Sequence, residues 1–228
     1  MPEKITLVFA QCGARAEQLE PSLSSFRRWF PEAEAVLYSD RPVNAAGVTN
    51  RVAGNPFGGP RAGHRYNDLF KAVGLMDVQE GFGIALDCDM AAVSGNVRTI
   101  IPMAARFGLC VPCNPRLLVR LDNTVGEDSD GWFGEDEGWG YAMNMSPIAF
   151  SVKHAAAHLA LMIYREAMMK RPVRGPSAMW RACWEAGFFP CLLPPQWCVC
   201  GNDCGVGNEI VLHVGHEKVR NHYANLIR

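Results

Sequence analysis

The chain has 228 residues, of which 49% are hydrophobic and 20% are charged, and its formal net charge is −1. This length allows one larger α/β domain or two small ones, and the small charge excludes a general attraction to nucleic acid or anionic membranes. No stretch approaches the ~20 apolar residues needed to cross a bilayer. We expect a cytoplasmic protein, because the first predicted strand begins too near Met1 to leave room for a signal peptide.

The nine cysteines are interpreted as reduced thiols, since their odd number argues against a complete disulfide framework. Two groupings could instead supply four zinc ligands: Cys110-x-x-Cys113 and Cys198-x-Cys200-x-x-x-Cys204. The second spacing differs from that of a standard zinc knuckle, and Cys110 lies in an apolar run typical of a strand. Buried thiols are therefore the favoured interpretation.

The N-terminal part predicts alternating strands and helices. Residues 5–10 and 35–40 are short apolar runs that predict strands, and residues 14–30 between them carry apolar side chains at helical spacing. This order favours a parallel strand pair joined by a right-handed crossover. Residues 44–63 are rich in Gly, Asn and Pro and predict a loop with one short edge strand.

A helix is predicted over residues 64–78, and its start is basic, with Arg61, His64, Arg65 and then Lys71. A solvated helix face would explain these residues. Alternatively, because the helix directly precedes an acidic strand end, its early residues could contact phosphate or sugar oxygens there.

That strand end is the run from Gly83 to Met90, which finishes in Asp87 and Asp89. Strand side chains alternate, so the two carboxylates should point the same way. Ligands of open α/β sheets bind beyond the carboxyl ends of strands, and carboxylate oxygens suit Mg²⁺ or Mn²⁺. A capped turn is the simpler explanation.

The middle of the chain predicts a helix over residues 97–107 and a strand over residues 109–112, followed by an acidic loop over residues 127–137. This loop carries six acidic residues among glycines and aromatics. It is either a solvated loop or a mobile sugar-binding lip. In the second case Glu135, Asp136 or Glu137 could be a catalytic base.

The C-terminal part predicts a strand at 141–150, helices at 152–169 and 177–186, and a strand at 188–193. The first of these helices is expected to bury an apolar face made of Ala155, Leu159, Met162, Ile163 and Ala167.

The run from Glu209 to Lys218 is predicted as a last strand, which delivers His213, Gly215 and Lys218. Glycine allows close backbone approach, and lysine is a point charge suited to phosphate. A satisfied surface or core histidine is the usual alternative to a metal ligand.

Taken in order, these motifs resemble those of nucleotide-sugar glycosyltransferases of the GT-A fold. The nearest resemblance is to the retaining family that includes glycogenin and the lipopolysaccharide galactosyltransferases. The motifs that carry it are Arg65-Tyr66-x-x-Leu69-Phe70, Leu86-Asp87-Cys88-Asp89, Tyr141-Ala-Met-Asn144, Leu193-Pro194-x-x-Trp197 and His213-x-Gly215-x-x-Lys218.

The resemblance implies a single α/β GT-A-like domain whose Rossmann-like, mostly parallel central sheet is flanked by helices, with Asp-x-Asp at a strand end. Residues 1–95 would be the nucleotide-binding half. Residues 96–228 would be the acceptor half, with the C-terminal metal and diphosphate motif. The implied activity is metal-dependent transfer of a hexose from a nucleoside-diphosphate sugar, such as a UDP-sugar, to a saccharide or other hydroxyl acceptor.

The resemblance also implies roles for individual residues. Asp89 and His213 would bind Mn²⁺ or Mg²⁺, with Asp87 bridging the metal and the ribose or sugar. The metal would act as a Lewis acid on the leaving diphosphate. The remaining roles fall to Gly215 and Lys218 for the diphosphate, Arg65 or Arg61 for phosphate or donor sugar, Gln11 and Asp40 for base and ribose, and Asn144 near donor sugar and acceptor.

Three departures from the family pattern leave alternatives open. Only Val214 separates His213 from Gly215, residues 175–177 replace the usual Asp-Gln, and Cys198 replaces the usual Asn. Retention and inversion are both open, since Glu135 or Asp136 could serve as the base of an inverting enzyme. A sugar-nucleotide nucleotidyltransferase and an inactive carbohydrate-binding relative are the alternative functions.

Overall fold

The computed structural model describes residues 3–14, 16–59, 61–117, 141–170, 175–201 and 203–227. The acidic loop, with Glu135, Asp136 and Glu137, lies outside these residues.

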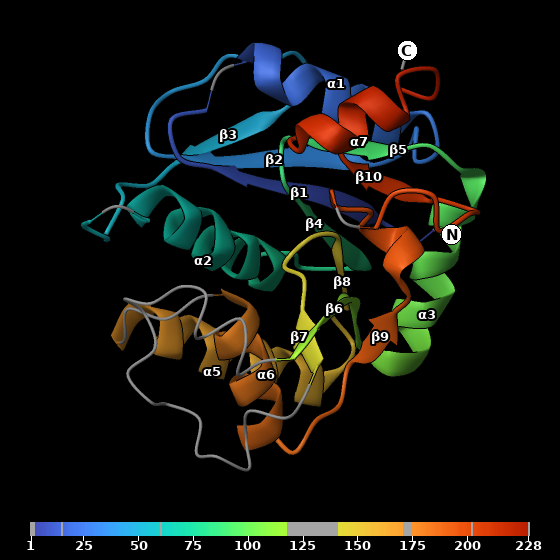
Figure 1. Cartoon of the computed structure of the whole chain (residues 1–228). Helices are drawn as coiled ribbons and strands as arrows, with labels where there is room; N and C mark the ends of the chain where they lie inside the picture. The colour runs from blue at the N-terminus through green and yellow to red at the C-terminus, as the bar shows by residue number, and fades with distance from the viewer. Residues whose placement is uncertain are drawn as a thin grey trace.

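Strands and helices alternate along the chain (Figure 1). In the first half the elements are β1 Ile5–Gln11, α1 Ala16–Arg27, β2 Glu34–Ser39, β3 Thr49–Val52, α2 Ala62–Met76, β4 Phe82–Leu86, β5 Met90–Ala92, the 3₁₀ helix η1 Gly95–Thr99 and α3 Ile100–Phe107. In the second half they are β6 Leu109–Leu117, β7 Tyr141–Met143, β8 Ile148–Ser151, α5 Ala155–Lys170, α6 Gly175–Glu185, β9 Cys191–Leu193, the 3₁₀ helix η3 Pro195–Trp197, β10 Val211–His213 and α7 Glu217–His222.

The central sheet has the order β3-β2-β1-β4-β8-β6-β7, and β9 pairs with β6. Strands β3, β2, β1 and β4 are parallel to one another, and β9 is parallel to β6. Strand β8 runs antiparallel to both β4 and β6. This arrangement confirms the expected α/β fold with a mostly parallel sheet.

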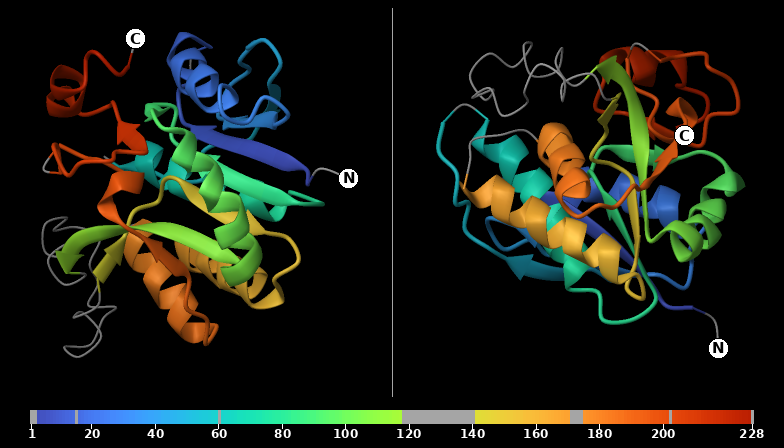
Figure 2. Two further views of the ribbon diagram at one scale, coloured as in Figure 1. Left: turned by 90° about the vertical axis from the view of Figure 1, so that its right-hand side faces the viewer. Right: turned by 90° about the horizontal axis from the view of Figure 1, so that it is seen from below.

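Helices cover both faces of the sheet, with α1 on one side and α2, α5 and α6 on the other (Figures 1 and 2). Along β1, Leu7 and Phe9 pack against the α1 side, and Val8 and Ala10 pack against the α2 side. A strand covered on both faces has no solvent-facing positions, which explains why its sequence is a continuous apolar run.

The chain then returns to its N-terminal half. Strand β10 pairs antiparallel with β5 in a small second sheet, in the register His213 to Met90. Figure 2 shows this C-terminal segment, in red, beside the N-terminal elements.

Several predicted elements differ from the observed ones. Residues 141–150 form two strands instead of one, because Met145, Ser146 and Pro147 make a turn between β7 and β8. The strand predicted at 188–193 is confined to β9.

The buried face of α5 was also predicted wrongly. Leu159 and Met162 are 46% and 38% exposed, whereas the buried positions are Ala157, Ala160, Leu161, Tyr164 and Met168. Alanines occur on both faces of α5, so the two faces are similar in hydrophobicity. The buried face is the one with the small residues Ala157 and Ala160, which let α5 pack closely against its neighbours. None of the helices in the described part of the chain has the length and apolar character needed to cross a membrane.

Close packing between β4 and α2 gives a test of this fold. A Cβ at Gly83 would lie 2.7 Å from Leu75 Cδ2 and 3.1 Å from Val78 Cγ2. We expect Gly83→Ala to lower the free energy of unfolding by about 1–3 kcal/mol through overpacking, measured by chemical denaturation. Gly54→Ala is the control, because a Cβ there meets nothing within 4 Å; equal stabilities of the two variants would contradict the packing.

Candidate functional site

The carboxyl ends of three parallel strands bring polar residues to one edge of the sheet. Gln11 is the last residue of β1 and pairs in register with Ser39 of β2, directly before Asp40. Asp87 follows β4, whose Leu86 pairs with Phe9 of β1. This is the edge at which open α/β sheets bind ligands.

Asp87 and Asp89 lie in a turn between β4 and β5 instead of on an extended strand. The Asp87 carbonyl accepts a hydrogen bond from Met90 N at 3.3 Å, which closes this turn. Since β5 pairs with β10, the turn lies beside His213. One ligand atom each from Asp87, Asp89 and His213 lie within 4.8 Å of one another.

Asp89 and His213 form an ion pair, with 3.2 Å between His213 Nε2 and Asp89 Oδ1. Burial disfavours the imidazolium, but hydrogen bonds to Asp89 and Cys200 raise the pKa of His213 to about 10. Burial alone would raise the pKa of Asp89, but the hydrogen bond with His213, the charge of His213 and further smaller contacts together lower that pKa below its usual value. Opposite charges therefore hold Asp89 and His213 together.

Asp87 is held by a buried lysine. Lys71 Nζ lies 2.8 Å from Asp87 Oδ1 and 3.2 Å from Asp68 Oδ1, and its side chain is only 2% exposed. Burial would lower the pKa of Lys71, but the two carboxylates raise it above its ordinary value. The Asp87 backbone N–H also donates to Ser146 Oγ at 2.8 Å. Asp87 is thus fixed in position by its contacts with Lys71 and Ser146.

Gly215 lies directly against Asp89. A Cβ at this position would be 1.9 Å from Asp89 Oδ2, so the residue must lack a side chain. Val214 N donates to the Asp89 carbonyl at 2.8 Å. Arg220 of α7 donates to the carbonyls of Val214 and Gly215 at 2.7 and 2.9 Å, which holds this loop in place.

These groups line a cavity of about 420 Å³. Its lining residues are Gln11, His64, Asn67, Asp68, Lys71, Asp87, Asp89, Asn144, Met145, Pro176, His213, Gly215 and His216.

Helix α2 supplies four of them, His64, Asn67, Asp68 and Lys71, which are spaced i, i+3, i+4 and i+7 on one face. Sequence reasoning noted the basic start of this helix but missed its polar stripe, although the spacing is readable. His216 was missed as well, since no pattern distinguishes it from a surface histidine.

Gln11, Asp40 and Asn144 are each held by a backbone or amide contact. Gln11 Oε1 accepts from Asn67 Nδ2 at 3.2 Å, and Asn144 Oδ1 accepts from Asn114 Nδ2 at 3.0 Å. Asp40 Oδ1 accepts from Gly13 N at 2.6 Å, which joins the end of β2 to the loop after β1. Burial would raise the pKa of Asp40, but this N–H and Arg41 lower it.

Four described residues expected at the site do not line this cavity. They are Asp40, Arg61, Arg65 and Lys218. Arg65 packs over the Phe57 ring, 4.2 Å from its centroid, and Lys218 is exposed on α7. Of the basic residues singled out around this helix, His64 and Lys71 therefore line the cavity, whereas Arg61 and Arg65 do not.

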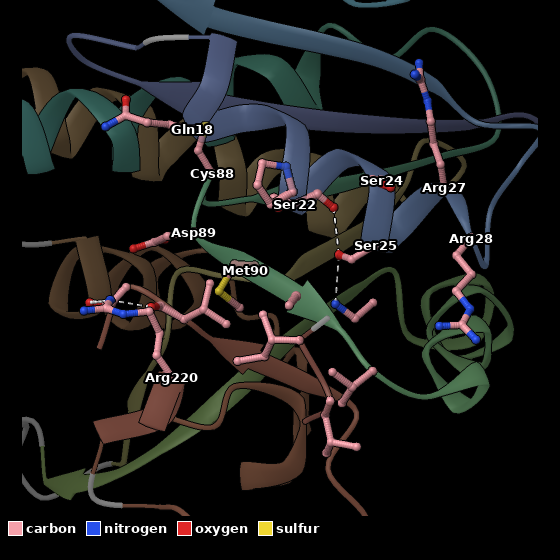
Figure 3. A pocket seen from close by; sticks show the side chains of 18 of the residues that line it. Gln18, Ser22, Ser24, Ser25, Arg27, Arg28, Cys88, Asp89, Met90 and Arg220 are labelled. Carbon is pink, nitrogen blue, oxygen red and sulfur yellow. Dashed lines mark hydrogen bonds between the residues drawn. The ribbon is translucent and has the colours of Figure 1, made fainter. Parts of the chain in front are cut away.

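A second cavity, of about 1,040 Å³, lies between α1, β5 and α7 (Figure 3). Ser22, Ser25 and Arg28 come from its α1 side, and Arg220 comes from α7. Gln11, Asp89 and Gly215 line both cavities. Asp89 and Gly215 therefore lie where two ligand-sized spaces meet, and Asp87 and His213 line the smaller one.

The four-cysteine zinc site does not form among the described residues. Cys110 is buried in β6, where it pairs in register with Cys191, and Cys198 and Cys200 lie beside His213. The pKa of the Cys200 thiol is lowered by hydrogen bonds with Cys198 and His213.

Comparison with known proteins identifies the fold. No protein-family model and no curated protein matches the sequence. The solved structure of WbbM, a bifunctional glycosyltransferase, is 11% identical with a TM-score of 0.59, and the match covers all of this chain but 50% of WbbM. An active-site mutant of LgtC is 10% identical with a TM-score of 0.55, covering 91% of this chain and 86% of LgtC.

A third structure, the 2-C-methyl-D-erythritol 4-phosphate cytidylyltransferase of Thermus thermophilus, is 16% identical over 84% of this chain and 88% of its own. Its TM-score of 0.48 is too low to support a comparison. The likeness to WbbM and LgtC shows that the chain has the GT-A-like glycosyltransferase fold. At this identity the fold is established, and the chemistry has to come from the site residues.

The contacts of Lys71 give a test of the site's construction. Lys71→Met keeps most of the side-chain volume but removes the cation that Asp68 and Asp87 both contact. We therefore expect the free energy of unfolding to fall by about 3–5 kcal/mol. Lys170→Met is the control, because Lys170 is 73% exposed in its ion pair with Glu166. Chemical denaturation of both variants measures the difference, and a loss below about 1 kcal/mol for Lys71→Met would refute the buried ion pair.

Proposed function

We propose that the protein is a divalent-metal-dependent glycosyltransferase that moves a hexose from a nucleoside-diphosphate sugar, such as a UDP-sugar, to a saccharide or other hydroxyl acceptor. One observation carries this proposal. Asp87, Asp89 and His213 place ligand atoms within 4.8 Å of one another at the ligand-binding edge of a GT-A-like sheet.

The residues present fit a hard divalent cation. Two carboxylates and one imidazole are a suitable donor set for Mn²⁺, and the open cavity leaves room for diphosphate oxygens beside them. Gly215 leaves room at Asp89 that any side chain would fill. In this proposal Asp89 and His213 hold the ion with Asp87, and a bound cation supplies Lewis acidity that neutralises charge on the leaving diphosphate.

The chain's own residues prepare this site before any substrate enters. Lys71 fixes the direction of the Asp87 carboxylate through the 2.8 Å contact. Arg220 and the Val214 N–H hold the loop that presents Gly215 to Asp89. Such preorganisation lowers the cost of arranging charged groups around the transition state.

We assign the two substrates to the two connected spaces. Gln11 and Asp40, at the carboxyl ends of β1 and β2, would contact base and ribose, and Gly215 would allow the diphosphate to approach closely. Lys71 and Asn144 face the smaller cavity, where the donor sugar would lie.

Glu135 or Asp136 remains our proposed base for an acceptor hydroxyl. Lys218, which is exposed, would meet the diphosphate only at the cavity rim.

Removal of one acidic ligand tests the function. In titration calorimetry, UDP should bind the wild type in the presence of Mn²⁺ and bind more weakly without it. Asp89→Asn should lower the Mn²⁺-dependent affinity by at least about 10–100-fold, the loss typical of disturbing even outer residues of metal sites. Glu166→Gln, on the exposed face of α5, is the charge-matched control. If Asp89→Asn and Glu166→Gln bound UDP with equal affinity, and Mn²⁺ did not change that affinity, the proposed site would be excluded.

Gly215 permits a second test that leaves every charged residue in place. Gly215→Ala places a methyl group against the Asp89 carboxylate, so we expect Mn²⁺-dependent UDP binding to weaken while the fold persists. Gly201→Ala is the matched control, because a Cβ there is no closer than 3.8 Å to the nearest atoms. Both glycines have backbone conformations open to other residues. Unchanged UDP affinity in Gly215→Ala would show that Asp89 does not serve the metal.

A further inference from the structure

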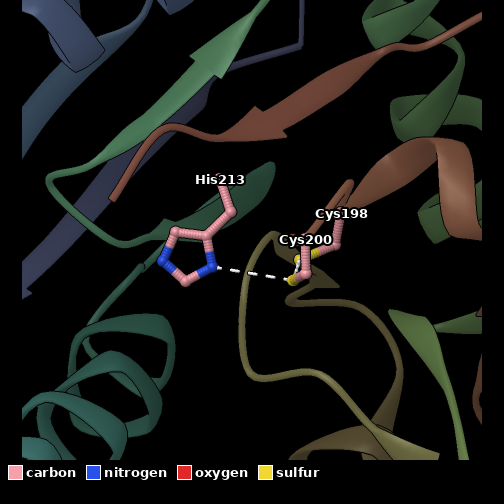
Figure 4. Close-up of side chains that lie close together, drawn as sticks. All are labelled: Cys198, Cys200 and His213. Atoms are coloured by element: carbon pink, nitrogen blue, oxygen red, sulfur yellow. Dashed lines mark hydrogen bonds between the residues drawn. The ribbon is translucent and has the colours of Figure 1, made fainter. Parts of the chain in front are cut away.

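The His213 ring has different partners at its two nitrogen atoms. Its Nε2 lies 3.2 Å from Asp89 Oδ1, and its Nδ1 lies 3.8 Å from Cys200 Sγ (Figure 4). The Cys198 and Cys200 sulfur atoms are 3.7 Å apart, and Cys198 is only 3% exposed. One ring nitrogen therefore lies beside a carboxylate oxygen, and the other lies beside a thiol sulfur.

Backbone pairing holds the two thiols in this position. Val199, between them, forms a parallel bridge with Leu212 of β10. Val199 N donates to Val211 O, and His213 N donates to Val199 O, each at 3.0 Å. Because alternate residues of an extended segment point the same way, Cys198 and Cys200 both project toward the His213 ring.

The spacing of these atoms matches a tetrahedral zinc site. Zinc binds sulfur at about 2.3 Å and nitrogen at about 2.0–2.1 Å, so tetrahedral ligands should be about 3.8 Å apart for two sulfurs and about 3.6 Å for sulfur and nitrogen. The observed separations are 3.7 Å and 3.8 Å. Two thiols and one imidazole prefer zinc to Mn²⁺ or Mg²⁺, which favour oxygen.

We propose that Cys198, Cys200 and His213 Nδ1 form a zinc site, with a fourth coordination position open to water. It differs from the four-cysteine arrangement suggested by spacing alone, because Cys110 and Cys113 take no part. His213 lines the 420 Å³ cavity, which gives the ion a route to the site.

The two metal sites share one histidine, and this gives zinc a regulatory effect that rests on the proposed function. A neutral imidazole has a single nitrogen lone pair. With zinc on Nδ1, the proton remains on Nε2 and is donated to Asp89, so this nitrogen cannot bind Mn²⁺. Zinc should therefore weaken Mn²⁺-dependent UDP binding without occupying the carboxylates.

Cobalt spectroscopy of the reduced, metal-free protein under anaerobic conditions tests the zinc site. We expect one equivalent of Co²⁺ to give a thiolate-to-cobalt charge-transfer band and intense visible bands of tetrahedral cobalt, both removed by one equivalent of Zn²⁺. Cys198→Ser and Cys200→Ser should lose the charge-transfer band. Cys191→Ser, which changes a partly buried cysteine on β9, should keep it. Absence of the band in the wild type, or its full retention in Cys200→Ser, overturns the proposal.

X-ray absorption of the zinc-loaded wild type gives a result that needs no variant to fold. Two sulfur neighbours at about 2.3 Å and at least one nitrogen neighbour support the site, and a shell of oxygen and nitrogen alone overturns it. Asp89→Asn separates the two claims, because it should retain the charge-transfer band. If the band persists there and Mn²⁺ has no effect on UDP binding to the wild type, the proposed function fails while the zinc site stands.

The shared histidine has its own readout. In the wild type, one equivalent of Zn²⁺ should reduce Mn²⁺-dependent UDP affinity at least tenfold. In Cys200→Ser, zinc should change that affinity by less than twofold relative to the same variant without zinc. Equal zinc effects in the two proteins would overturn the regulatory part of the proposal.

Discussion

The acid site depends on a positive charge placed inside the protein. The Lys71 ammonium, almost fully buried, contacts Asp68 and Asp87 together. An unpaired lysine at this depth would lose its proton, so the charge of Lys71 depends on the two carboxylates that it contacts. The same contact fixes Asp87 beside Asp89, where our proposed metal site lies.

The other half of the site comes from the far end of the chain. Pairing of β5 with β10 sets Met90 opposite His213 and thereby places the histidine beside the acids. Gly215 and Arg220 complete the arrangement, since one leaves room for Asp89 and the other holds the loop. A separate bridge between Val199 and Leu212 of β10 brings the thiols to the other ring nitrogen of His213. One histidine thus connects an oxygen-rich and a sulfur-rich environment.

Local patterns in the sequence predicted most elements, the strand-end position of Asp87 and the motif around His213. Apolar runs and helical spacing are local properties, so they can be read from one chain. The turn at Asp87 and Asp89 and the three-residue strands β5 and β10 depend on pairing between distant segments, which periodicity does not contain. Arg65 illustrates the same limit, because stacking on Phe57 determines its direction. The polar stripe of α2 was readable but was overlooked among its basic residues.

The central claim is that Asp87, Asp89 and His213 bind one divalent cation beside a diphosphate. A crystal structure with Mn²⁺ and UDP, with data collected to locate manganese by anomalous scattering, tests it most directly. We expect a single manganese peak between the two carboxylates and His213 Nε2, in contact with the diphosphate oxygens. A manganese peak elsewhere in the cavities, or UDP bound with no manganese beside these three residues, would contradict it.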